Sequence, residues 1–369
     1  MIKKKVVIQS YLFLSPDAHL GVEQPIGGAI RYLRDLGRLF YEAGFDVHFL
    51  QKSNKDFYLS YEDWAHVQGL RVPQGAWSDV IFSYKAYQIC KADIVCYGNM
   101  EDSFPFIHSN SIAIQHGIWW DYPIPVWKKM VQEFRVKYVA KRVKSVICVD
   151  TNFSNWCRTK WPKEEFILKK LYYLPNYADL NIFKCEQVES ISGKPKLLFP
   201  RRFEYKRGYS VFLEMCKVLG AKGYEFEAVF VGEGSKKDYI EKIVNDIGVP
   251  FEIVSADYDS MPKFYKNAFL TFIPTLWSEG TSLAAIESIC SGCPVIASDV
   301  GGLGNIIVPG ITGEICGPSV ENFVSVTEKY LKNKALRDAL AKKCLLVRDA
   351  FDKNKWGVKV LEIINKNFI

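Results

Sequence analysis

The sequence predicts an α/β protein built from two doubly wound parallel sheets. Its 369 residues correspond to about two domains of ~150 residues each. Short continuous apolar runs alternate with longer amphipathic segments, which is typical of parallel strands covered on both faces by helices. A polar stretch punctuated by Gly and Pro separates two sets of such runs. We therefore expect two domains of about six strands each.

In the first half, strands are expected at residues 6–9, 47–50, 94–97, 112–115, 145–149 and 171–174. Residues 51–90 fit this alternation least well and predict an irregular excursion. In the second half, strands are expected at residues 197–199, 228–231, 251–254, 270–274, 295–298 and 313–316. The link runs from residue 174 to 196, and we place the boundary so that one domain covers 1–178 and the other 179–350.

The net charge of +7 is concentrated in the first half. Residues 1–178 carry 23 basic and 17 acidic side chains, whereas the remainder is close to neutral. One predicted helix, residues 125–144, holds seven Lys and Arg residues against the single acidic residue Glu133. This confined excess argues against a nucleic-acid-binding protein. The segment is amphipathic as well as basic, so either a solvated helix face or a surface for anionic lipid explains it.

The cysteines indicate a reducing compartment. Ten cysteines are scattered through apolar runs, which is typical of buried free thiols in a cytoplasmic protein. Cys290 and Cys293 have the spacing of a redox or zinc pair, but no second pair or nearby His completes a metal set, so packing is favoured. No apolar run approaches the ~18 residues needed to cross a bilayer, so membrane contact is expected to be peripheral at most.

The most informative segment runs from Phe272 to Asn305. A predicted strand is followed by Glu279 and Gly280, and Thr281 and Ser282 then offer a helix N-terminus beginning near Leu283. Free backbone amides at such a terminus suit a phosphate or diphosphate group. Glu279 and Glu287 lie two helical turns apart, and a carboxylate can accept both hydroxyls of a ribose. The spacing alone is weak evidence and favours a solvated helix face.

Two further segments carry candidate binding residues. The loop FPRRFEYKRG, residues 199–208, follows a predicted strand and crowds four cations, Arg201, Arg202, Lys206 and Arg207. Ligands bind at the carboxyl ends of strands in open α/β sheets, so this loop could neutralise a diphosphate, although an exposed basic turn is an equal alternative. Gly27 and Gly28 precede an amphipathic helix and would allow close backbone approach to a phosphate or sugar.

Taken together, these segments resemble retaining glycosyltransferases of family 4. Residues 279–287 match the E-x7-E motif of that family, and the continuation CSGCPVIASDVGG resembles its A-x-G-x-PVIAS-x-x-GG. PRRFEYKRG resembles the basic loop of the family, LPNYADLNIF its interdomain segment, VGEG at 231–234 its V-G-x-G, and Gly27 with Gly28 its N-terminal glycine loop. The matches follow the family order from about residue 21 to 317, and the C-terminal ones are the specific ones.

The resemblance implies a fold and a set of site residues. It implies the GT-B fold, with two Rossmann-like domains facing each other across a cleft, the acceptor on the first and the donor on the second. The helix at 351–369 would return to the first domain. Glu287 would bind the ribose, Glu279 a hydroxyl of the donor sugar, and Arg202 and Lys206 the departing diphosphate. The family loop usually ends in Lys-Gly, whereas Arg207 precedes Gly208 here, so Lys206 and Arg207 both remain candidates.

Other donor contacts implied by the resemblance involve the glycines and the helix N-terminus. They are Gly28, Arg201, Gly232, Gly234 and Gly280, with the backbone amides of Thr281, Ser282 and Leu283. His116 resembles the family's active-site His near the donor sugar, and the neighbouring Trp119 and Trp120 could line an acceptor site. Asp257 and Asp259 have a metal-binding spacing, but the basic loop makes a metal unnecessary, so we expect neither metal nor other cofactor.

The predicted activity is metal-independent transfer, with retention, of a sugar from a UDP- or GDP-sugar to a glycan or lipid-linked acceptor in the synthesis of a cell-surface polysaccharide or glycolipid. The expected location is the cytoplasm, with peripheral contact of residues 125–144 at the inner face of the membrane. The alternatives are a sugar phosphorylase, a nucleotide-sugar epimerase, or a non-catalytic glycan- or membrane-binding scaffold of the same fold.

Overall fold

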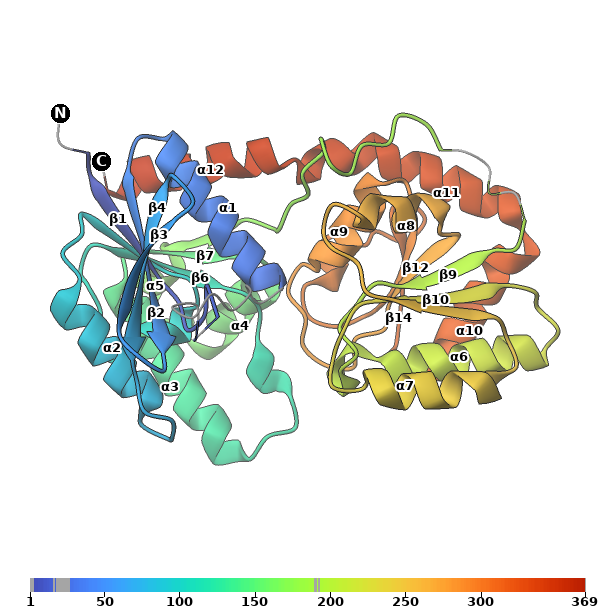
Figure 1. Ribbon diagram of the computed structural model, residues 1–369, viewed down its shortest axis with the longest axis horizontal. Coiled ribbons are helices and arrows are strands. Elements are labelled where there is room, and N and C mark those ends of the chain that lie inside the picture. The colour runs from blue at the N-terminus through green and yellow to red at the C-terminus, as the bar shows by residue number, and fades with distance from the viewer. Residues whose placement is uncertain (1–2, 16, 18–26, 189–190, 192, 369) are drawn as a thin grey trace. The chain divides into compact units, whose positions relative to one another are not determined.

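The structure is a computed structural model that describes residues 3–15, 17, 27–188, 191 and 193–368 (Figure 1). The chain divides into two compact units. The first contains residues 1–116, 123–174 and 357–369, and the second contains 117–122 and 175–356. Across the described residues, no helix combines the length and apolar character needed to cross a membrane. All ten cysteines are free, and eight of them are buried.

The first unit is built on an eight-stranded sheet with the order β3-β4-β2-β1-β5-β6-β7-β8. The strands are β1 Lys5–Gln9, β2 Asp46–Ser53, β3 Phe57–Tyr61, β4 Ala65–Arg71, β5 Ile94–Tyr97, β6 Ser111–Gln115, β7 Ser145–Cys148 and β8 Leu171–Tyr173. Neighbours pair in parallel except β3 and β4, and Val7 of β1, for example, lies opposite His48 of β2. The central strands are buried along nearly their whole length because helices cover both faces.

The prediction of an irregular excursion at residues 51–90 was wrong. Residues 57–71 form the antiparallel hairpin β3–β4, and β4 extends the parallel sheet beyond β2. In the hairpin, Phe57 and Leu59 are half-buried and alternate with the exposed Tyr58 and Ser60. This alternation is the pattern of an edge strand with one wet face, whereas the sequence analysis looked for continuous apolar runs.

The helices of the first unit are α1 Gly28–Glu42, α2 Ser78–Ile89, α3 Val126–Arg142, α4 Thr151–Lys160 and α5 Glu165–Leu168, with the single turn η2 Met100–Ser103 at one of its loops. The single turn η3 Trp119–Asp121 belongs to the second unit. Helix α1 buries Tyr32, Leu33, Leu36 and Phe40 on one face, at the spacing of an amphipathic helix. Most of helix α12 Lys353–Phe368 also belongs to this unit, and the Asn367 side chain near its end donates a hydrogen bond to the Tyr172 hydroxyl of β8.

The second unit contains a six-stranded parallel sheet with the order β11-β10-β9-β12-β13-β14. The strands are β9 Lys196–Phe199, β10 Glu227–Val231, β11 Phe251–Val254, β12 Leu270–Ile273, β13 Val295–Ser298 and β14 Gly313–Cys316. All six were predicted from their apolar runs. The chain winds outward from β9 to β11 and then returns to β12 on the other side of β9. The strand order therefore reverses between β9 and β12, which is where doubly wound sheets bind ligands.

Helices cover both faces of this sheet (Figure 1). They are α6 Tyr209–Ala221, α7 Lys237–Ile243, α8 Met261–Asn267, α9 Leu283–Cys290, α10 Val320–Lys332 and α11 Lys334–Val347, with single turns η4 Tyr205–Arg207, η5 Val244–Ile247, η6 Leu303–Asn305 and η7 Arg348–Phe351. Two apolar clusters form the core, one around Phe199, Phe212 and Phe230, and the other around Ile273, Ile286 and Val295. This packing fixes the loops at the carboxyl edge of the sheet.

Candidate active site

Charged side chains converge at the point where the strand order reverses in the second unit. The loop after β9 supplies Arg201 and Arg207, and the loop after β12 supplies Thr275 and Glu279. Glu279 Oε2 accepts hydrogen bonds from Arg201 Nη2 at 2.6 Å and Arg207 Nη1 at 2.5 Å. It also accepts one from the Thr275 hydroxyl at 3.1 Å, and that hydroxyl accepts from Arg201 Nη1 at 3.0 Å.

Burial makes this cluster electrostatically strong. The side chains of Arg201 and Glu279 are 6% and 11% exposed, and that of Arg207 is 28% exposed. Burial alone would raise the pKa of Glu279, but the two guanidinium groups outweigh it and lower that pKa to about 2. Burial lowers the pKa of Arg201, whereas the charge of Glu279 raises that of Arg207. The cluster therefore holds two cations and one carboxylate, a net positive charge at the sheet edge.

Backbone contacts hold the two loops in place. Gly301, in the segment after β13, has a φ of +54°, and a Cβ there would lie 2.1 Å from the Glu279 carbonyl oxygen. Gly302 N–H donates to that same oxygen at 2.8 Å. Gly232 and Gly234, predicted as donor contacts, approach the backbone of residues 201–203 so closely that a Cβ would lie 2.4 Å and 2.7 Å from it. The close backbone contacts of Gly232, Gly234 and Gly301 thus position the segments that carry Arg201 and Glu279.

The structure separates the four cations of the 199–208 loop into two pairs. Arg201 and Arg207 point to Glu279, whereas the side chains of Arg202 and Lys206 are 55% and 57% exposed. Their nitrogen atoms lie 3.8 Å and 3.5 Å from Glu204 oxygens. The pair named from the sequence for the diphosphate, Arg202 and Lys206, is therefore the more exposed one.

Helix α9 carries the remaining predicted residues. Ser282 is its N-cap residue and Leu283 its first residue, and Gly280 lies in the preceding loop. The Thr281 hydroxyl accepts a hydrogen bond from the Asn176 backbone N–H at 2.9 Å, which anchors the helix start. Glu287 is 4% exposed and accepts from the Tyr265 hydroxyl at 3.1 Å. Glu279 precedes the helix, so the two carboxylates are held by different partners.

Two residues of this site were missed by the sequence analysis. Thr275 links Arg201 to Glu279, and Trp277 places its ring 5.6 Å from that of Tyr205 in the cationic loop. Both lie between the predicted strand and Glu279, and their only signal was membership of the loop that follows it. The Asp257 carboxylate, part of the metal-like spacing, accepts from Ser260 N–H at 2.8 Å. Over the described ranges, no three His, Cys, Asp or Glu side chains gather as a metal site would require.

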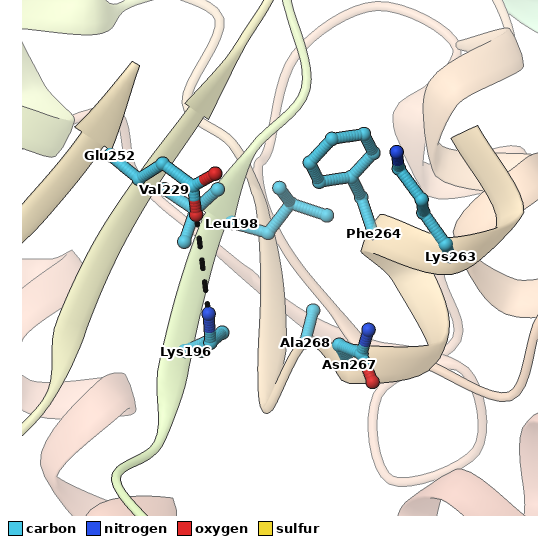
Figure 2. A pocket seen from close by; sticks show the side chains of 8 residues that line it. All are labelled: Lys196, Leu198, Val229, Glu252, Lys263, Phe264, Asn267 and Ala268. Carbon is cyan, nitrogen blue, oxygen red and sulfur yellow. Dashed lines mark ion pairs between the residues drawn. The ribbon is translucent and has the colours of Figure 1, made fainter. Parts of the chain in front are cut away.

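A separate cavity lies at the start of β9. Figure 2 shows Lys196 and Glu252 on the strands and Lys263, Phe264 and Asn267 on or beside α8, around a volume of about 200 Å³. Lys196 begins β9, whereas Arg201 follows its end. This cavity therefore does not include the charged cluster.

In the first unit, His116 follows β6. Its Nε2 lies 2.9 Å from the Gly98 carbonyl oxygen, so Nε2 carries the proton and donates it, and its ring meets Tyr32 edge-on at 5.2 Å. Burial lowers the pKa of His116 to about 4, although the hydrogen bond to Gly98 acts to raise it. The imidazole is therefore neutral at pH 7. Gly28 is the exposed first residue of α1. The segment from 21 to 26 of the predicted glycine loop lies outside the described residues.

The two tryptophans proposed for the acceptor differ in accessibility. Trp119 is 52% exposed, whereas Trp120 is 2% exposed. Their rings contact edge-on at 6.1 Å. Trp119 therefore offers a face for stacking on a sugar, and Trp120 supports it from below the surface.

Sequence comparison identifies the region that holds the charged cluster. Residues 183–344 match the family model described as glycosyl transferases group 1. This region is a glycosyl transferases group 1 domain. It contains Arg201, Arg207, Glu279 and Glu287. The match to the family predicted from the sequence is thereby confirmed at the level of group 1.

Curated relatives support the same assignment. An uncharacterised glycosyltransferase of Methanocaldococcus jannaschii is 26% identical over 174 residues, which are 46% of this chain and 43% of that protein. The lipopolysaccharide 1,2-N-acetylglucosaminetransferase of Salmonella typhimurium is 27% identical over 183 residues, 46% of this chain and 47% of its own. The match thus spans about half the length of these curated relatives.

Solved structures establish the fold of the whole chain. Sucrose-phosphate synthase from Thermosynechococcus elongatus superimposes with a TM-score of 0.81 over 99% of both chains at 18% identity. Anabaena HepE in complex with UDP-glucose superimposes with a TM-score of 0.74 over 98% of this chain and all of its own, at 12% identity. The chain that carries the group 1 domain has the GT-B fold, as the sequence predicted.

Proposed function

We propose that the protein is a glycosyltransferase that moves a sugar, with retention and without a metal, from a UDP- or GDP-sugar to a glycan or lipid-linked acceptor. The observation that carries the proposal is the convergence of Arg201, Arg207 and Glu279 where the strand order reverses in a group 1 domain. An anionic ligand fits this position because two of its three charges are positive. Anabaena HepE binds UDP-glucose on the same fold, and the Salmonella relative transfers N-acetylglucosamine in lipopolysaccharide.

In this proposal Arg201 and Arg207 stabilise the departing diphosphate. Negative charge grows on the diphosphate as the glycosidic bond breaks, so fixed cations aimed at it lower the barrier more than they stabilise the bound donor. Both guanidinium groups are already oriented by Glu279, so little reorganisation accompanies the reaction. Arg202 and Lys206 are exposed and paired with Glu204, which makes them weaker candidates for the same role.

The two glutamates have different proposed ligands. All three hydrogen bonds to Glu279 go to Oε2, and Oε1 accepts none from the described residues. Oε1 is therefore available to a hydroxyl of the donor sugar. Glu287 would hold the ribose hydroxyls, with Tyr265 orienting its carboxylate. The backbone amides at the start of α9 would meet the diphosphate.

The acceptor side of the proposal rests on the segment that follows β6. His116 is neutral and donates from Nε2 to Gly98, so Nδ1 would act as an acceptor toward a sugar hydroxyl. Trp119 would provide a stacking face. The proposed location is the cytoplasm, at the inner face of the membrane, where nucleotide sugars and lipid-linked acceptors meet.

The experiment is a screen of UDP-, GDP- and ADP-sugars for release of nucleoside diphosphate, with the product's anomeric configuration read by NMR and the reaction repeated in EDTA. We expect release from one nucleotide series, retention, and no loss in EDTA. Glu287→Gln should lose activity, and Glu204→Gln, which removes a half-buried carboxylate of the same unit, should not. Formation of a sugar 1-phosphate from a glycan and inorganic phosphate, without release of nucleoside diphosphate, would identify a phosphorylase. A changed sugar that is still attached to its nucleotide would identify an epimerase, and no reaction would identify a scaffold. Each of these outcomes contradicts the proposal.

A further inference from the structure

The first half of α3 presents apolar side chains to solvent. Val126, Trp127, Met130, Val131 and Phe134 are between 50% and 72% exposed. Positions 127, 130, 131 and 134 repeat at the spacing that places them on one face of a helix. A contiguous apolar surface of this kind on a folded protein marks a contact with another apolar phase.

The opposite side of the same turns is polar and fixed to the domain. Gln132 is 3% exposed, and its Nε2 donates to Glu101 Oε1 at 2.9 Å. Arg135 forms an ion pair with Asp79 of α2 at 3.3 Å and donates to the Glu101 carbonyl oxygen at 3.2 Å. The first half of the helix is thus held by polar contacts with its apolar stripe outward, whereas the second half buries Val136, Val139 and Ala140 as an ordinary surface helix does.

Aromatic side chains continue this surface from α3 to α2. Phe104 contacts Phe134 of α3 at 6.1 Å, and Phe106 contacts Tyr84 of α2 at 5.2 Å. Tyr84 and Tyr87 are 49% and 40% exposed. The two helices belong to the same unit and are joined by the ion pair described above (Figure 1). Tyr and Trp are the side chains that favour the boundary between lipid headgroups and acyl chains.

The cations of α3 divide into paired and unpaired ones. Lys137 and Lys141 lie 3.0 Å and 3.2 Å from Glu164, and the Arg142 guanidinium stacks on Tyr138. Lys128 and Lys129 form no ion pair with any described residue, and both lie within the apolar turns. These two ammonium groups therefore remain available to anionic headgroups.

We infer that the stripe of α3 (Val126, Trp127, Met130, Val131 and Phe134) with Lys128 and Lys129 docks on an anionic lipid bilayer. The apolar side chains enter the headgroup boundary, and the two lysines meet lipid phosphates. A second copy of the chain is a poorer occupant, because two stripes that each carry unpaired lysines would repel each other. The inference builds on the proposed function, since a membrane-docked transferase would meet a lipid-linked acceptor without releasing it into water.

The test is co-sedimentation with vesicles of phosphatidylcholine containing about 30% phosphatidylglycerol, compared with phosphatidylcholine alone. We expect the wild-type protein to sediment with the anionic vesicles. Lys128→Glu/Lys129→Glu and, separately, Met130→Ser/Phe134→Ser should each reduce binding about tenfold or more. The matched control is Lys355→Glu/Lys359→Glu, which makes the same charge change on exposed positions of α12 and should leave binding within about twofold.

Equal binding by the control and the Lys128/Lys129 variant, or no binding by the wild type, would overturn the inference. A concentration-dependent dimer that the Met130/Phe134 variant abolishes would also overturn it in favour of a second copy. Circular dichroism confirms that each variant is folded. Release of nucleoside diphosphate, measured without vesicles, separates this inference from the proposed function. The docking variants should release it as the wild type does. If the proposed function is wrong, the wild type will not release it either.

Discussion

Removing the charge of Glu279 should destabilise the second unit by about 3 kcal/mol at pH 7. The folded structure holds the Glu279 pKa at about 2 against an ordinary value of 4.5, and a tenfold change in a proton equilibrium corresponds to about 1.4 kcal/mol. Glu279→Gln keeps the size of the side chain but leaves Arg201 and Arg207 facing each other without their shared carboxylate. For a unit of this size, the loss corresponds to about 6–12 °C in melting temperature.

The pH dependence of the same variant provides the decisive readout. Because the folded pKa lies below the unfolded one, the ionised carboxylate contributes fully above pH 4.5, and this contribution is lost as the pH falls from 4.5 to about 2. Differential scanning calorimetry of wild type and Glu279→Gln should therefore show a gap that is constant from pH 7 to 5 and narrows below pH 4.5. Glu204→Gln, which removes the half-buried partner of the exposed Arg202 and Lys206, should shift the transition by less than about 2 °C. A gap below about 1 kcal/mol at pH 7, or one that does not narrow in acid, would refute the reasoning.

Three further outcomes are expected. Gly301→Ala should destabilise the protein by about 2 kcal/mol or more, because the new Cβ would lie 2.1 Å from the Glu279 carbonyl oxygen. Gly304→Ala is the control and should not destabilise it, because that Cβ would meet no atom closer than 3.9 Å. Thermal unfolding of the two variants measures the difference. Glu287→Gln should weaken UDP or GDP binding about tenfold by calorimetry, and equal affinity would remove the ribose assignment. The pKa of His116 in the folded protein is about 4, below its ordinary value of 6.5, so the unfolded chain takes up a proton first as the pH falls. Between pH 7 and 5 the free energy of unfolding of the wild type should therefore fall by about 2 kcal/mol more than that of His116→Gln. Urea unfolding that shows the same pH dependence for both proteins would contradict this.

The sequence predicted the second unit better than the first because four of its strands are apolar runs that are buried along nearly their whole length. Residues 295–298 and 313–316, for example, are strands with the predicted bounds. The hairpin of β3 and β4 was not predicted, because buried and more exposed residues alternate along its strands and it lies at the edge of the sheet. Periodicity within a strand shows which faces are buried, and it does not show which strands will pair.

The sequence predicted which loops form the candidate site. It did not predict the direction in which each side chain of these loops points. Arg201 and Arg202 are neighbours in the sequence, yet Arg201 contacts Glu279 and Arg202 is exposed. The difference depends on how Gly232 packs against the backbone of the 201–203 segment, which is a contact between distant parts of the chain. The amphipathic pattern of α3 was equally visible, but only its docking through Gln132 and Arg135 decides that the apolar stripe faces outward.

The most direct test of the account is to compare Arg207→Ala with Lys206→Ala in calorimetric binding of a nucleoside diphosphate and of the corresponding nucleoside. The two cations are adjacent in the sequence, but only Arg207 reaches the Glu279 cluster. If this cluster binds the diphosphate of the donor, Arg207→Ala should weaken diphosphate binding about tenfold or more and leave nucleoside binding unchanged, while Lys206→Ala changes both by less than about threefold. Equal losses in the two variants, or a loss that is the same for nucleoside and diphosphate, would contradict the account.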